Sequence, residues 1–143
     1  MNANVKGAHG ANRLLLSTSA SDFMMLRSSL ELVSLELRTV LVDVGEPIRH
    51  VYFPHSAVIC LMAVMGKDEI AETATVGPEG VVGIEVFLGK PTAMHRTLVQ
   101  VPGAASRIGM RELSAALQKS GSLRTLMLRY IGAFLFQVTQ SVA

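Results

Sequence analysis

The chain has one cysteine, Cys60, among its 143 residues. A single cysteine excludes a disulfide within the chain, and an unpaired thiol is usual for proteins of a reducing compartment. Cys60 stands inside the apolar run A-V-I-C-L-M-A-V-M. A cysteine in such surroundings is more often a buried structural thiol than a redox sensor. We therefore expect a cytoplasmic protein in which Cys60 has a packing role.

Long hydrophobic runs and a strong charge of either sign are also missing. The apolar tract near the C-terminus, 130–136, is far shorter than the ~20 residues that cross a bilayer, and the N-terminus lacks the apolar core of a secretory signal. The net charge is only +2, which does not indicate nucleic-acid binding by this segment. Hydrophobic residues make up 50% of the chain, so its length suits one globular domain without a membrane partner.

The sequence shows no pattern typical of a catalytic or metal site. It has no His-x-His or His-x-x-x-His spacing, and neither Glu46 nor Glu79 joins the scattered histidines, which are His9, His50, His55 and His95. This argues against a metal-dependent cupin enzyme, which would share a β-barrel architecture. The chain also lacks a nucleophile elbow, a P-loop lysine and a cysteine paired with a base. We expect no catalytic residues, no metal ligands and no enzymatic activity.

What the sequence does contain is a series of short apolar segments divided by turn signals. Segments rich in leucine and β-branched residues recur between 30 and 109, with turns at 45–47 and 66–68. About eight short strands, with a turn every 8–12 residues, are typical of a sandwich or jelly roll. The pattern therefore predicts a mostly β fold with flanking helices, either a sandwich or a jelly-roll barrel.

Helical patterns flank this β region. Residues 1–11 are small and polar, which predicts a mobile N-terminal arm. Residues 12–29 are expected to be helical, with Ser19 or Ser21 capping a short helix at Asp22. Residues 110–119 form an amphipathic pattern, and Ser122 is placed to cap the helix that follows.

The expected last helix, 123–143, carries two apolar stripes. The first stripe has the alternating spacings of a coiled-coil seam and consists of Leu123, Met127, Tyr130, Phe134, Gln137 and Ser141. The second consists of Leu128, Ile131, Leu135, Val138 and Val142. Two stripes indicate two packing partners, the chain's own barrel and a second body, and we assign the first stripe to dimerisation. The alternative is a helix buried wholly within one domain.

The most informative stretch runs from Val76 to Val101 and reads V-G-P-E-G-V-V-G-I-E-V-F-L-G-K-P-T-A-M-H-R-T-L-V-Q-V. It predicts a strand, a glycine-rich turn, a short helical turn with exposed N–H groups, a cation and a second strand. Such a unit can cradle a phosphate without catalytic machinery. The alternatives are that the glycines only form turns and that Arg96 is a surface cation or a partner of Glu85.

The order of these features resembles the N-terminal sensor domain of bacterial Crp/Fnr-type transcription regulators, a cyclic-nucleotide-binding family. The resemblance covers 12–143 and is strongest at Val51-Tyr52-Phe53-Pro54, at 76–88 and at 136–141. It implies a double-stranded β-helix (a jelly-roll β-roll) with a ligand pocket over 12–122, the start of a dimerisation helix over 123–143, and a DNA-binding domain beyond residue 143. The chain ends at Ala143 without a helix-stop signal, and we expect it to be a piece of a longer protein.

The resemblance also implies ligand-binding residues. Gly83 matches the glycine that opens the family's phosphate turn, but Ile84 stands where the family has a ribose-binding glutamate and Glu85 follows one place late, which predicts a carboxylate aimed elsewhere. Arg96 and Thr97 match the phosphate-binding pair, and Leu98 replaces a small residue. On the last helix, Thr139 and Gln140 match base-contacting positions, although they could equally be polar positions of a dimer seam.

Two functions remain open at this point. The first is a sensor and dimerisation domain with a small-molecule effector, which could be a cyclic nucleotide (cAMP or cGMP), although the phosphate and ribose motif is degenerate. The second is a dimerisation scaffold without a ligand, in which Ile84, Leu98 and Phe87 fill the pocket. A cupin-type enzyme is a third and weaker interpretation.

Overall fold

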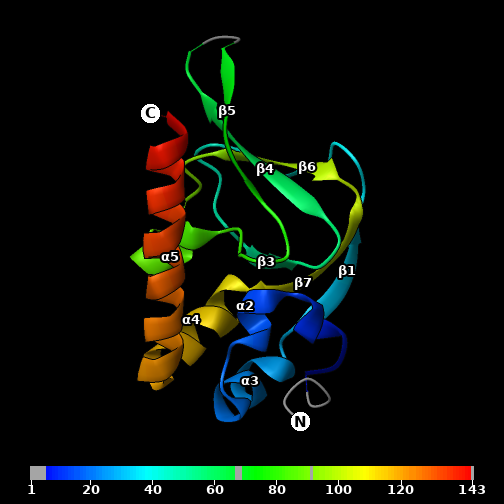
Figure 1. Ribbon diagram of the computed structural model, residues 1–143, viewed down its shortest axis with the longest axis vertical. Coiled ribbons are helices and arrows are strands. Elements are labelled where there is room, and N and C mark those ends of the chain that lie inside the picture. Colours follow the sequence, from blue (N-terminus) through cyan, green and yellow to red (C-terminus); the bar gives the residue numbers. More distant parts are fainter. Residues whose placement is uncertain (1–5, 67–68, 91, 143) are drawn as a thin grey trace.

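Two antiparallel sheets form the body of the molecule (Figure 1), for which a computed structural model describes residues 6–66, 69–90 and 92–142. The first sheet has the strand order β1 (Glu31–Leu35), β7 (Gly103–Gly109) and β3 (His50–Pro54). The second has the order β2 (Val40–Val42), β6 (Arg96–Val101), β4 (Val58–Val64) and β5 (Ile70–Val76). The neighbours in both sheets are non-consecutive in the chain, as in a jelly roll.

The space between the two sheets is filled by one hydrophobic cluster. It takes Leu35 and Ala105 from the first sheet and Ile59, Val76 and Val99 from the second. A second cluster lies on the other side of the first sheet, where Phe53 and Ile108 pack against the helices. Alternate residues of the strands of the first sheet thus face two different cores.

The helices cover the end and one side of the roll. The described helical segments are η1 (Gly7–Ala11), α2 (Arg13–Leu16), α3 (Ala20–Arg27), η2 (Ile84–Leu88), α4 (Met110–Lys119) and α5 (Gly121–Val142). Figure 1 shows α2, α3 and α4 grouped at the end that holds the N-terminus, with α5 running along the side of the roll toward the β4–β5 hairpin. The predicted fold class is confirmed, with seven strands in the described residues where about eight were expected.

The segment 6–11 differs from the mobile arm expected over 1–11, of which 1–5 lie outside the described residues. Lys6 is buried, and its ammonium donates hydrogen bonds to the carbonyl oxygens of Leu16 and Thr18 at 2.6 and 2.5 Å. These carbonyls lie at the end of α2, where helical carbonyl groups lack partners. A lysine that supplies them is held in place, so this half of the predicted arm is packed against the fold.

Capping of the helices was predicted in part correctly. Ser19 caps α3, since its hydroxyl accepts a hydrogen bond from the backbone N–H of Asp22 at 3.1 Å. The cap of α5 was predicted at Ser122, but the hydroxyl of Ser120 accepts the hydrogen bond from the backbone N–H of Leu123 at 3.1 Å. Ser122 instead donates to the carboxylate of Asp22. The last helix therefore begins earlier than its apolar pattern indicated.

The packing of α5 corrects the predicted dimerisation stripe. Leu123 and Met127 are fully buried in the chain's own helical core, with Tyr130 packed beside them, and Phe134 packs on the cluster between the sheets. These four positions pack against the chain's own fold, Leu123 and Met127 fully and Tyr130 and Phe134 in part. Gln137 is exposed, and the side chain of Ser141 lies outside the described residues. Both stripes are apolar, so the sequence pattern alone could not tell which one the roll would cover.

The apolar positions that α5 leaves exposed lie on its other side. Leu128, Leu135 and Phe136 are 55%, 53% and 64% exposed. Leu128, Gly132, Leu135 and Thr139 are all exposed and follow one another at spacings of 4, 3 and 4 residues, which is the spacing of a coiled-coil seam. We call these four positions the outer seam.

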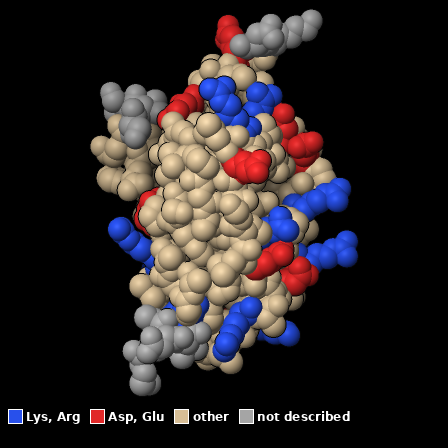
Figure 2. Space-filling model, turned by 90° about the vertical axis from the view of Figure 1, so that its right-hand side faces the viewer, with Lys and Arg blue, Asp and Glu red and all other residues tan. Residues whose placement is uncertain are grey.

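Two further predictions concern exposure and charge. Cys60 is buried, and burial raises the pKa of its thiol to about 11, as expected of a structural cysteine. Figure 2 views the molecule from the β1 side, away from α5, and shows Lys and Arg interspersed with Asp and Glu around an uncharged centre. The described residues of that face thus mix both signs of charge and form no basic patch of the kind that binds nucleic acid. Among the described residues, no helix combines the length and the hydrophobicity needed to cross a membrane.

Candidate functional site

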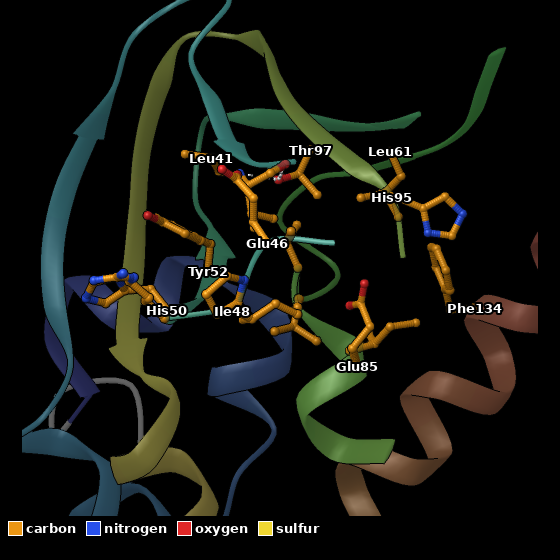
Figure 3. A pocket seen from close by; sticks show the side chains of 17 residues that line it. Leu41, Glu46, Ile48, His50, Tyr52, Leu61, Glu85, His95, Thr97 and Phe134 are labelled. Carbon is orange, nitrogen blue, oxygen red and sulfur yellow. Dashed lines mark hydrogen bonds between the residues drawn. The ribbon is translucent and has the colours of Figure 1, made fainter. Parts of the chain in front are cut away.

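A cavity of 240 Å³ opens between the two sheets and α5. Its wall is formed by residues of β2, β3, β4, η2 and β6, and α5 contributes Phe134. Figure 3 shows Glu85 and Phe134 on one side of this space and His50 and Tyr52 on the other. Most of the lining is apolar, with a few polar groups, as is usual for small-molecule sites.

The glycine-rich turn borders the cavity, and so does Glu85, which follows it. Gly83 has φ +109°, a left-handed conformation that favours glycine, and its Cβ position lies 3.1 Å from the Val51 side chain. A 3-10 helix starts directly after it, where successive side chains are about 120° apart. Ile84 and Glu85 therefore both border the cavity. The expectation that the late Glu85 carboxylate is aimed elsewhere is wrong.

Strand β6 separates the predicted phosphate pair. Its side chains alternate between the two faces, so Thr97 and Val99 are buried while Arg96 points away from the cavity. The Thr97 hydroxyl lines the cavity and accepts a 3.2 Å hydrogen bond from the backbone N–H of Val42. The Arg96 guanidinium forms an ion pair with Asp43 at 3.0 Å. The geometry thus does not bring Arg96 and the glycine turn together.

The Arg96–Asp43 pair also changes the pKa of the Asp43 carboxyl. The hydrogen bond from Arg96 is the main cause that lowers the pKa of the Asp43 carboxyl below its ordinary value, and the N–H of Val44 acts in the same direction. Both side chains are partly exposed. Water screens such pairs, so Arg96 is held by a contact that an anion could displace.

The two predicted positions on the last helix lie outside the cavity. Thr139 is exposed on the outer seam, and its hydroxyl donates to the carbonyl of Phe136 at 2.8 Å. Gln140 borders a separate hollow between α5 and β5, which also includes Thr75, Phe134 and Gln137. Phe134 is thus the α5 residue shared by the cavity and this hollow.

The expectation that Leu98 and Phe87 crowd or fill the pocket is wrong. Leu98 lies on the outward side of β6, opposite Cys60 in the neighbouring strand, and Phe87 packs against the helical core. Of the three proposed filling residues, Ile84 alone lines the cavity. The space therefore remains open.

Five polar residues of the lining were missed by the sequence analysis. They are Glu46 and Arg49 in the β2–β3 connection, His50 and Tyr52 on β3, and His95 just before β6. The signal that could have found His95 was period-two alternation with Thr97 and Val99. No comparable signal marks Glu46, since it enters the lining through the folding of a turn. Among the residues that the structure describes, no three His, Cys, Asp or Glu side chains gather as metal ligands.

A second contact ties α5 to the glycine-rich segment. The ring of Tyr130 lies directly on Gly80, where any Cβ would overlap the phenol oxygen. Burial is the main cause that raises the pKa of Tyr130 to about 12, and the backbone of Val81 forms a hydrogen bond with its hydroxyl. Two residues of α5, Tyr130 and Phe134, thus touch the segment 80–85 or the cavity beside it.

Solved structures with the same arrangement are numerous, although no sequence-family model and no curated protein sequence matches the chain. The sensor domain of the transcriptional regulator DNR from Pseudomonas aeruginosa has a TM-score of 0.70 and 17% identity, over 96% of this chain and 94% of that one. A cyclic nucleotide-binding domain from Methylobacillus flagellatus has a TM-score of 0.76 and 13% identity, over 99% and 83%. The chain has the cyclic-nucleotide-binding-domain fold.

The same fold occurs within a longer regulator. The c-di-GMP responsive global regulator CLP from Xanthomonas campestris has a TM-score of 0.69 and 18% identity, over 85% of this chain and 60% of that chain. The structural neighbours of this chain thus include domains of Crp/Fnr-type transcription regulators. Because the identities are below 20%, these similarities establish the fold of this chain alone. The chemistry of the cavity must be argued from the residues of this chain.

Proposed function

We propose that this chain is the effector-sensing and dimerisation domain of a Crp/Fnr-type transcription regulator. The effector occupies the 240 Å³ cavity, two copies pair through α5, and DNA is contacted by a further domain. The regulator CLP supports the last point, since this chain corresponds to 60% of its length. The names of the neighbours DNR and CLP, both regulators, support a regulatory role over an enzymatic one.

The observation that carries this proposal is the position of Phe134. It is a residue of the proposed dimerisation helix and also lines the cavity, together with Glu85 and Thr97 from the roll. A ligand in the cavity would contact the roll and α5 at once. A ligand with different affinities for two packings of α5 would shift the balance between them. Such a shift would change how the paired helices, and any domains attached to them, are arranged.

Cyclic nucleotides are the first effectors to test. The cavity presents Thr97 and the start of η2 to a phosphate, but the cation of the predicted pair, Arg96, is bonded to Asp43. A bound phosphate would have to attract Arg96 away from that carboxylate. Removing the carboxylate should therefore strengthen binding of a cyclic nucleotide, and removing the guanidinium should weaken it.

Calorimetric titration with cAMP and with cGMP tests this version of the proposal. We expect Asp43→Asn to bind more tightly than the wild type and Arg96→Gln to bind more weakly, if either nucleotide is the effector. Glu36→Gln serves as the control, because it also replaces a carboxylate by a carboxamide, at an exposed turn position. No heat at millimolar nucleotide with any variant would remove cyclic nucleotides as effectors and leave the wider sensor role to be tested with other ligands.

A scaffold that dimerises without any effector is the second candidate. The exposed Leu128, Leu135 and Phe136 favour it, because apolar side chains clustered on one helix face indicate a partner surface independently of any ligand. It predicts that no compound in a metabolite panel raises the melting temperature of the domain. The sensor proposal predicts at least one such compound, and a smaller rise in a Phe134→Ala variant.

A further inference from the structure

The carboxylate of Glu85 is the one nine-tenths-buried ionisable group in the described lining of the cavity. Its side chain is 7% exposed, and Oε2 accepts a 2.8 Å hydrogen bond from the backbone N–H of Met94. The other oxygen, Oε1, has no hydrogen-bond partner among the described residues. Figure 3 shows the carboxylate pointing into the cavity toward the space below His95. A carboxylate oxygen that has no donor from the protein takes its partner from solvent or from a ligand.

The free oxygen is accessible from the cavity. No fully buried side-chain nitrogen or oxygen within the described ranges lacks a partner, so Oε1 must be reached by solvent through the open space. The group is thus anchored on one side by Met94 and available on the other. This geometry suits an acceptor that is preorganised for a donor group.

The other charged and titratable groups of the lining do not favour an anion beside Glu85. The exposed Glu46 adds a second carboxylate, the exposed Arg49 adds a cation, and Arg96 is turned outward to Asp43. Burial is the main cause that lowers the pKa of His50, which is therefore neutral at pH 7. Tyr52 and His95 also line the space. A ligand anion placed against Glu85 would meet like charge without a buried cation to offset it.

We propose that the cavity binds a small molecule with an apolar body and a hydrogen-bond donor, an ammonium or a hydroxyl group, seated on Glu85 Oε1, and that it disfavours ligands whose buried end is an anion. The apolar walls, which include Ile48, Val81, Ile84 and Phe134, hold the body. The volume of 240 Å³ lies below the about 300–1,000 Å³ of drug-sized sites, which favours a ligand of one or two rings. This inference deepens the proposed function, because it names the ligand class of the same cavity.

Three fragments with one phenyl ring and different end groups test the proposal: 2-phenylethylamine, 2-phenylethanol and 3-phenylpropionate. Each is titrated into the ¹⁵N-labelled chain, and affinities are taken from the amide shifts of residues 81–86 and 95–97. We expect the amine or the alcohol to bind about tenfold more tightly than the propionate, the size of effect typical of a hydrogen bond to a charged group. Whether 2-phenylethylamine or 2-phenylethanol binds more tightly shows whether the site prefers a cationic or a neutral donor.

The variant Glu85→Gln provides the decisive comparison. Its amide oxygen can still accept from the Met94 N–H, so the fold is retained, while the charge that selects against an anion is lost. We expect the ratio of the affinity for the amine or alcohol to the affinity for the propionate to fall to near one in Glu85→Gln. The same ratio should be unchanged in Glu36→Gln. Equal affinities in the wild type, a preference that survives in Glu85→Gln, or no shift in the cavity with any fragment would overturn the inference.

The same titrations separate this inference from the proposed function. A preference for the donor that depends on Glu85, without any change in α5 resonances or in the oligomeric state, would support the inference and contradict the sensor role. A response of α5 to cAMP, with no donor preference among the fragments, would support the sensor role and contradict the inference.

Discussion

The carboxylate of Asp22 in α3 accepts a 2.6 Å hydrogen bond from the hydroxyl of Ser120, which lies 98 positions later at the start of α5. Ser122 donates a second bond of 2.6 Å to the same carboxylate. Burial by itself raises the pKa of Asp22, but the bonds from Ser120, Ser122 and Ser19 together outweigh it and lower the pKa below its ordinary value. The first turn of the helix that reaches the cavity is thereby fixed to the N-terminal helices.

Replacing Ser120 by alanine should destabilise the domain by about 1–3 kcal/mol. The substitution removes the α5 cap on Leu123 and leaves the buried Asp22 with one fewer donor. Urea unfolding followed by circular dichroism measures the free energy of unfolding. Ser28→Ala, at an exposed position after α3, should change it by only a few tenths. Equal effects of the two substitutions would contradict the anchoring role of Ser120.

The anchoring serine shows how far the sequence could predict this structure. Local signals were sufficient for the strands, for α4 and for the Ser19 cap, because each depends on neighbouring residues. The choice of Ser120 over Ser122 depends on the carboxylate of Asp22, which the chain supplies from 98 residues away. Non-local partners of this kind cannot be read from periodicity.

In the candidate site, too, locally encoded positions could be predicted and positions set by long-range packing could not. Gly83, Ile84 and Thr97 reached the cavity because their turn and strand are locally encoded. The outward position of Arg96 follows from alternation with Thr97, and its partner Asp43 lies 53 positions earlier. Thr139 and Gln140 depend on which face of α5 the roll covers. The packing of the roll, and not the pattern of the helix, decides that face.

Gly80→Ala should destabilise the domain because of the contact with Tyr130. The new methyl group would overlap the phenol oxygen and the adjacent ring carbons. Overpacking of this kind typically costs ~1–3 kcal/mol, since neighbouring side chains must leave their preferred rotamers. Thermal unfolding of Gly80→Ala, of Tyr130→Phe and of the double variant measures the coupling. We expect the double variant to lose less stability than the sum of the two single ones.

The matched control for that cycle is Gly132→Ala, with all variants compared in a Leu135→Glu background because Gly132 also lies on the outer seam. Gly132 lies exposed in α5 with nothing near its Cβ position, and alanine is favoured over glycine in a helix by ~0.5–1 kcal/mol. The same chemical change should therefore stabilise the chain at 132 and destabilise it at 80. Destabilisation of similar size at both positions would show that the Tyr130 contact is not the cause.

Acidification should destabilise the domain through a pair of histidines joined by one serine. The Ser106 hydroxyl lies 2.6 Å from His9 Nδ1 and 2.6 Å from His55 Nε2. Burial is the main cause that lowers the pKa of both imidazoles, with Arg27 acting also on His9 and His9 on His55. The folded state thus binds protons less readily than the unfolded state. Stability should be independent of these groups well above pH 6.5 and fall as the pH drops below it.

Urea unfolding at half-unit steps between pH 8 and pH 5 measures this dependence. Each histidine can contribute at most ~1.4 kcal/mol per pH unit between its unfolded and folded pKa values. A His9→Gln/His55→Gln variant should show a shallower slope, with a remainder from His50, whose pKa burial also lowers. A slope identical to that of the wild type would contradict the assignment.

Pairing of two copies through the outer seam is the last prediction. Leu128 and Leu135 lie one heptad apart on the exposed face of α5, and Gly132 between them permits close approach of a second helix. We expect the wild type to sediment as a dimer and Leu135→Glu to sediment as a monomer at the same concentration, because two buried carboxylates would face each other across the seam.

Leu32→Glu supplies the control, since Leu32 is 55% exposed in β1, on the side of the molecule opposite α5 (Figure 1). The same substitution there should leave the dimer intact, so a loss of pairing in Leu135→Glu alone would localise the interface to the helix. Sedimentation equilibrium over a tenfold concentration range distinguishes weakened pairing from none. A wild type that stays monomeric throughout that range, or a Leu32→Glu variant that dissociates equally, would contradict dimerisation through this seam and remove the proposed route from the cavity to a second subunit.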